Sequence, residues 1–115
     1  MDRRIEALHD WGCNTTEALE RMLDDEEFYM ECLYTVVENP NFEILKKALT
    51  EKNAEKAFES AHALKGILGN VGVTPMYELI VEIVEPLRNG HWENLMEKFT
   101  TLAEMKAHLE DIIKN

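Results

Sequence analysis

The chain has 115 residues, 45% of them hydrophobic, with five glycines and three prolines. This composition predicts one globular domain, spanning residues 1–115, and excludes a disordered chain. Its 23 acidic and 12 basic side chains give a formal net charge of −11. Such a charge repels phosphodiester backbones and anionic lipid headgroups, so we expect binding neither to nucleic acid nor to a membrane.

No targeting segment is visible. No apolar run approaches the roughly 20 residues that span a bilayer, and the opening MDRRIEALHD lacks the apolar part of a signal peptide. Cys13 and Cys32 lack metal-site spacing and are expected to be reduced thiols. We therefore expect a cytoplasmic protein, and the opening Met1 favours a stand-alone one.

The N-terminal part of the chain predicts one or two short helices. Ile5, Leu8 and Trp11 recur at helical spacing. Asn14 lies three residues before Glu17, which is typical of a capping pair at a helix N-terminus.

The rest of the chain predicts four longer helices. Asp24 or Asp25 is expected to cap the first of them and Asn53 the second. Thr74 is expected to cap the third, with Pro75 at its first helical position. The expected bounds are about 25–50, 54–70, 75–88 and 92–114.

Two further prolines modify these helices. Pro40 interrupts the first, and Pro86 should kink or fray the last turn of the third. No segment predicts a strand. Long amphipathic helices joined by short turns predict an all-α protein: an antiparallel up-down four-helix bundle with one or two short additional N-terminal helices.

The helix expected at about 54–70 contains Gly66 and Gly69. Each glycine inside a helix costs about 0.8–1.0 kcal/mol relative to alanine, so both need a reason. A helical projection places His62 roughly 130° from the centre of the apolar arc, on the solvent side. Lys65 follows at the spacing where helix side chains meet. The arc consists of Ala54, Ala57, Phe58, Ala61, Leu64, Leu68 and Val71.

This arrangement suits phosphoryl acceptance. An unperturbed imidazole is mostly uncharged near neutral pH and is a good nucleophile. A phosphoryl group would add about two negative charges, which the Lys65 ammonium could partly neutralise. Simpler readings exist for each feature: a lone surface histidine often has no function, as we expect for His9, His91 and His108, and a helical glycine can serve close packing. The features favour a function only in combination.

The string His62-Ala63-Leu64-Lys65-Gly66, with a further glycine at Gly72, resembles the motif of histidine-containing phosphotransfer (HPt) domains. The likeness continues from Asn70 to Tyr77 and from Leu87 to Gly90, and it covers about residues 14–113. The chain is similar to stand-alone bacterial members of that family.

The resemblance implies a phosphorelay intermediate. His62 would accept a phosphoryl group from the aspartyl phosphate of a response-regulator receiver domain and pass it to another receiver. Lys65 would stabilise the phosphate and Gly66 would give the partner steric access. The partner-binding face would include Glu59, Ala63, Gly69 and Asn70.

The resemblance also implies that the chain has no catalytic turnover and no cofactor of its own. It would be a phosphoryl carrier without autonomous turnover, not an enzyme. Nothing in the sequence resembles a glycine-rich nucleotide loop that follows a strand, so no ATP-binding motif is expected, and we expect a monomer. It would need no cofactor, because the receiver supplies the divalent metal, and its partners would be receiver domains or a hybrid sensor histidine kinase. Its histidines have no companions at metal-ligand spacing, so no metal site is expected.

One position departs from the family pattern. Some members hydrogen-bond the histidine with a polar residue on the neighbouring helix, and Val84 aligns with that position. The orienting contact would then come from water, from Asn70 or from nothing. This departure motivates an alternative function: a non-transferring helical module that binds a receiver or kinase through the same face.

Overall fold

A computed structural model describes residues 2–115, and within them every regular element is a helix. The expected all-α class is therefore confirmed. The seven helices are α1 (Arg3–Trp11), α2 (Thr15–Arg21), α3 (Glu26–Val37), α4 (Asn41–Glu51), α5 (Ala54–Asn70), α6 (Thr74–Arg88) and α7 (Leu95–Lys114).

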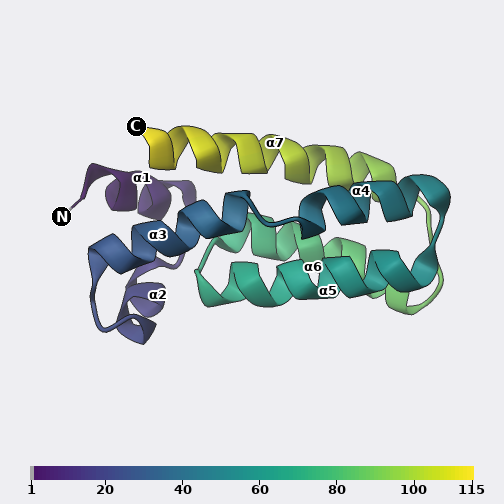
Figure 1. Ribbon diagram of the computed structural model, residues 1–115, viewed down its shortest axis with the longest axis horizontal. Coiled ribbons are helices and arrows are strands. Elements are labelled where there is room, and N and C mark those ends of the chain that lie inside the picture. Colours follow the sequence, from purple (N-terminus) through teal and green to yellow (C-terminus); the bar gives the residue numbers. More distant parts are fainter. Residues whose placement is uncertain (1) are drawn as a thin grey trace.

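The longer helices lie side by side along the longest axis of a molecule that measures 43 × 24 × 21 Å (Figure 1). α3 and α4 follow one another along that axis, and α5, α6 and α7 run beside them. α5 packs against α4 and α6, while α7 packs against α6, α4, α3 and α1. One continuous hydrophobic core fills the space between these helices, and its fully buried members include Tyr29, Leu33, Leu64, Leu68, Ile80 and Leu102.

Side-chain caps fix the starts of four helices, α1, α2, α3 and α5. The Asn14 side chain accepts a hydrogen bond from the Glu17 amide and donates one to the Glu17 carboxylate, so the expected capping pair is confirmed. The side chain of Asp25 caps α3, and that of Asn53 caps α5. Each satisfies a backbone N–H group that the first helical turn leaves without a partner.

The expected helix bounds are confirmed apart from one, the start of α7. The first long helix is interrupted at Pro40, as expected, and is thereby divided into α3 and α4, because residues around Pro40 cannot continue the hydrogen-bond ladder. α6 runs through Pro86 to Arg88 and agrees with the expected bounds to within one residue, but its N-cap is Val73 and not Thr74. α7 begins at Leu95, three residues later than expected, because the preceding Asn94 has a left-handed φ of 62°.

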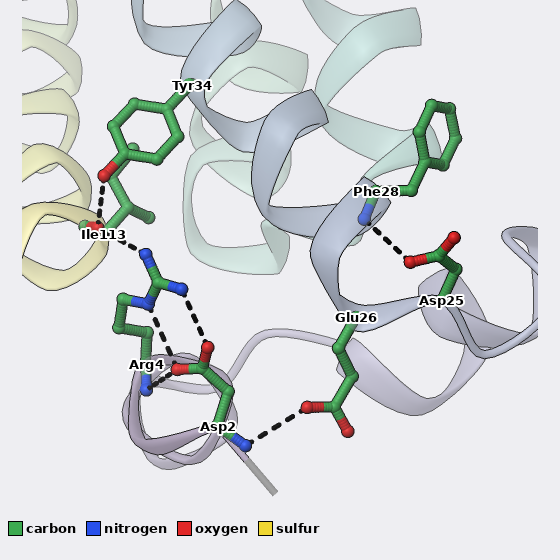
Figure 2. Close-up of polar contacts among 7 residues, drawn as sticks. All are labelled: Asp2, Arg4, Asp25, Glu26, Phe28, Tyr34 and Ile113. Atoms are coloured by element: carbon green, nitrogen blue, oxygen red, sulfur yellow. Dashed lines mark hydrogen bonds and ion pairs between the residues drawn. The ribbon is translucent and has the colours of Figure 1, made fainter.

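The two chain ends are joined by a polar cluster (Figure 2). Arg4 Nη1 and the Tyr34 hydroxyl both donate to the Ile113 carbonyl, at 3.2 and 2.8 Å. The Asp2 carboxylate accepts hydrogen bonds from the Arg4 guanidinium and backbone, which lower the pKa of Asp2 from 3.8 to about 2. The Asp2 amide donates to Glu26, so α1, α3 and the end of α7 are linked.

Among residues 2–115, no helix combines the length and the apolar character needed to cross a membrane.

Candidate functional site

His62 lies on the exposed side of α5, as the helical projection predicted. The opposite side of the helix is fixed in the core by Ala61, Leu64 and Leu68, which are fully buried. His62 therefore stands on a helix whose rotation about its own axis is set by core packing. Its own ring remains accessible to a partner.

The imidazole of His62 stacks on the ring of Phe58, one helical turn earlier. The two ring centroids are 5.6 Å apart and the ring planes differ by 14°. Phe58 was expected in the core, but it is only half-buried. The helical projection gives the directions of both side chains correctly. It does not show that Phe58, at the edge of the apolar arc, is close enough to His62 for the two rings to stack. An aromatic residue four positions before a histidine is the signal that could have suggested the stack.

Lys65 supplies a cation beside His62. It lies three residues later on the same helix, is half-buried, and forms no ion pair with any of residues 2–115. Its ammonium is thus available for an incoming anion. On the other side of His62, Glu55 and Glu59 are exposed carboxylates that would repel one.

The two glycines of α5 have different environments. A Cβ atom added at Gly66 would have no heavy atom within 4 Å, so internal packing gives no reason for that glycine. A Cβ at Gly69 would lie 3.1 Å from Cε1 of Tyr77 on α6. Close packing of α5 against α6 therefore explains Gly69. Of these two glycines, only Gly66 leaves the backbone of α5 uncovered and open to solvent.

Two contacts fix the register between α5 and α6, which run in opposite directions (Figure 1). Gly69 faces Tyr77, and Phe58 lies beneath the guanidinium of Arg88. Because one step forward along α5 is one step back along α6, His62 lies level with Val84. Val84 is fully buried and offers no hydrogen-bonding group.

The other expected binding residues occupy different places. Glu59 is exposed and Ala63 is half-buried, both next to His62 along the helix. Asn70 is exposed, but it lies eight positions after His62 along the helix, a rise of about 12 Å. Of the three alternatives for an orienting contact, this separation argues against Asn70.

The C-terminal end of α5 is held by donors from the N-terminal helices. Arg21 Nη1 donates to the Asn70 carbonyl at 2.9 Å, and the buried Tyr29 hydroxyl donates to the Val71 carbonyl at 2.8 Å. Carbonyls at a helix end have no partner within the helix, so these bonds satisfy groups that would otherwise be unpaired. They also fix α5 against α2 and α3.

Gly72 completes this attachment. Its carbonyl accepts a hydrogen bond of 2.8 Å from the Asn14 amide. Its φ is +70°, and a Cβ atom there would lie 2.5 Å from the Asn14 carbonyl oxygen. Glycine is therefore required at this position by the fold, both for its backbone conformation and for the close approach.

Potential metal ligands do not gather around the histidine. Within residues 2–115, no three His, Cys, Asp or Glu side chains lie close enough together to hold a metal ion. The charged groups that flank His62 along α5 are instead the Lys65 ammonium and exposed carboxylates. They form a surface that can receive a group from another molecule.

A helical bundle with an exposed histidine, an adjacent free lysine and a bare stretch of helix defines a candidate phosphoryl carrier. The comparison with protein families identifies the class: the Hpt domain model matches residues 39–114, well over half of the chain. The chain belongs to the Hpt domain family. Comparisons with curated proteins and with solved structures returned no match.

The match begins at residue 39, whereas the resemblance seen in the sequence begins at about residue 14. It therefore contains α4 to α7, including His62, and leaves α1 to α3 outside. Hpt domains are histidine phosphocarriers of phosphorelay signalling and are not kinases, so the family identifies the general role of this chain.

Proposed function

We propose that this protein is a phosphorelay intermediate that carries a phosphoryl group on His62. The observation that carries the proposal is the exposed imidazole on a core-anchored helix, beside an unpaired Lys65 and an open Gly66. The donor would be the aspartyl phosphate of a receiver domain, and a second receiver would accept the group. Receiver domains and a hybrid sensor histidine kinase are the proposed partners.

The transfer itself is a substitution at phosphorus. The unprotonated imidazole nitrogen attacks the phosphorus atom, a nitrogen–phosphorus bond forms, and the bond from phosphorus to the aspartyl oxygen breaks. The departing group is a carboxylate. Lys65 would offset part of the charge on the transferred group, and Gly66 would let the partner's loops approach the ring.

The remaining features of the proposal follow the family. The receiver would supply the divalent metal and the acidic pocket, and this chain would hold the group without turning over a free substrate. We also propose the antiparallel four-helix arrangement typical of such carriers, with α3 and α4 together forming one of the four. A monomeric state and a cytoplasmic location remain predictions.

Incubation with a phosphorylated receiver domain tests the proposal. Wild-type protein should become phosphorylated, and the bond should be acid-labile and base-stable, as expected for phosphohistidine. His62→Gln should abolish the labelling, while His91→Gln, a matched change at another exposed histidine, should not. Undiminished labelling of the His62→Gln variant contradicts the proposal.

A second candidate function rests on Val84. Because the residue level with His62 is apolar and buried, the chain could be an interaction module that binds a receiver or kinase without taking up phosphate. Receiver binding that is unchanged by His62→Gln, together with no phosphorylation of the wild type, would support this candidate.

A further inference from the structure

We propose that Phe58 is a positioning residue for the phosphoacceptor: it holds the His62 imidazole by stacking, in place of a hydrogen bond from the neighbouring helix. This inference rests on the proposed function and adds to it a residue that the motif itself does not contain. Arg88 supports this arrangement, because its guanidinium packs on the same Phe58 ring.

An exposed histidine needs some restraint if it is to attack in line. Its ring can rotate about two side-chain bonds, and a partner must find the nucleophilic nitrogen in one orientation. None of residues 2–115 forms a hydrogen bond with the His62 ring in this structure. Val84, level with it on α6, has no group to donate or accept.

The stack with Phe58 is a contact that can restrain the ring. Two nearly parallel rings at a centroid distance of 5.6 Å are in the range of an offset aromatic pair, which favours some ring orientations over others. Phe58 is itself half-buried and packs against the core, so it is less mobile than the histidine. Because Phe58 is held by the core, its stack with His62 restricts the motion of the exposed imidazole.

Arg88 restrains Phe58 from the neighbouring helix. Its Cζ atom lies 5.2 Å from the centroid of the Phe58 ring, within the range of a cation–π interaction. The same guanidinium donates from Nε to Glu85 at 3.0 Å, which limits where it can move. Arg88, at the end of α6, thus packs on Phe58, and Phe58 in turn stacks on His62.

The stack also suits the product of transfer. A ring that has formed a nitrogen–phosphorus bond and keeps a proton on its other nitrogen carries positive charge. The negative face of the Phe58 ring attracts such a charge. The group that positions the neutral nucleophile consequently favours the phosphorylated ring as well.

Phosphoramidate, a small-molecule phosphoryl donor, tests positioning without any partner surface. Phe58→Leu removes the ring but keeps an apolar side chain of higher helix propensity, and Phe58→Tyr keeps the ring. We expect the Leu variant to be phosphorylated roughly three- to tenfold more slowly than wild type, and the Tyr variant within about twofold of it. Arg88→Gln should have a smaller effect, about twofold.

Proton NMR of the histidine rings separates positioning from a general structural effect. The Phe58 ring current should displace the His62 ring signals, and the displacement should disappear in Phe58→Leu and persist in Phe58→Tyr. The protein contains its own control, because His108 contacts Trp11 edge-on, with centroids 4.7 Å apart, away from Phe58. The His108 signals should stay constant in every folded variant.

Each result decides the inference separately from the function. If wild type is phosphorylated on His62 but folded Phe58→Leu reacts at the wild-type rate, the positioning role is refuted and the carrier function stands. Unchanged His62 ring signals in Phe58→Leu would refute the stack itself. Absence of any phosphorylation of wild type, by phosphoramidate or by a receiver, would instead contradict the proposed function. Should the Leu variant fail to fold, the Tyr and Arg88→Gln variants and the wild-type His62 signals still test the inference.

Discussion

Gly66→Ala should make the protein more stable and a poorer partner for a receiver domain. A Cβ atom at this position meets nothing within 4 Å, so the substitution removes no contact and creates no clash. The gain is the difference in helix propensity, about 0.8–1.0 kcal/mol. For a chain of this length, that corresponds to a rise of about 4 °C in the melting temperature.

Gly69→Ala is the matched control, because it makes the same change three residues later in the same helix. There the new methyl group would lie 3.1 Å from the Tyr77 ring, so the neighbour must move and the propensity gain is offset. Thermal unfolding followed by circular dichroism should rank Gly66→Ala above wild type, with Gly69→Ala clearly below Gly66→Ala.

Function is measured on the same variants. Transfer from a phosphorylated receiver should fall in Gly66→Ala, since the added methyl group faces the incoming protein. Phosphorylation by phosphoramidate should be unchanged, because that donor needs no such clearance. Loss of stability in Gly66→Ala would refute the claim that a Cβ atom at this position meets no other part of the protein. Undiminished transfer from the receiver would refute the proposed role in partner access.

Three other predictions concern the fold. Gly72→Ala should lower the free energy of unfolding by more than about 2 kcal/mol in denaturant titrations, because φ is +70° and the Asn14 carbonyl lies in the way; wild-type stability would refute this. Burial raises the pKa of the Cys13 thiol to about 12, so an alkylating reagent at pH 8 should modify half-buried Cys32 first, and the reverse order would contradict the burial of Cys13. Because the pKa of Asp2 is lowered to about 2, its contribution to stability is present above about pH 4 and is lost as the pH falls towards 2. The stability difference between wild type and Asp2→Asn should therefore shrink over that interval, and a constant difference would argue against the Asp2 contact.

The helices and their caps could be predicted because both depend on nearby residues. Hydrophobic residues at helical spacing identify the buried faces, and Asn14, Asp25 and Asn53 each cap a helix through a hydrogen bond only a few residues away. The start of α7 was predicted too early, because Trp92 fits the apolar pattern of the helix. Trp92 instead lies in the turn before it, and the helix begins only after Asn94, whose backbone is left-handed.

The exposure of His62 could be predicted for the same reason: it follows from the angle of one residue on one helix. The distinct reasons for Gly66 and Gly69 could not. They depend on where Tyr77 of α6 lies, and that position is set by the packing of two helices. Sequence spacing alone treats the two glycines alike.

Contacts between distant segments were also beyond the sequence. The bonds from Arg21 and Tyr29 to the end of α5 join residues more than 40 positions apart. The shared acceptor Ile113 in Figure 2 joins both chain ends. No local pattern encodes such pairs, although the bonds from Arg21 and Tyr29 fix the helix that carries His62.

Mapping the phosphorylated residue tests the central claim most directly. The chain has four histidines, and three of them serve as internal controls. Wild-type protein phosphorylated by a receiver domain, digested at neutral to alkaline pH and analysed by mass spectrometry should carry the phosphoryl group on the peptide that contains His62. A phosphoryl group on the peptide of His9, His91 or His108, or on none, would contradict the account.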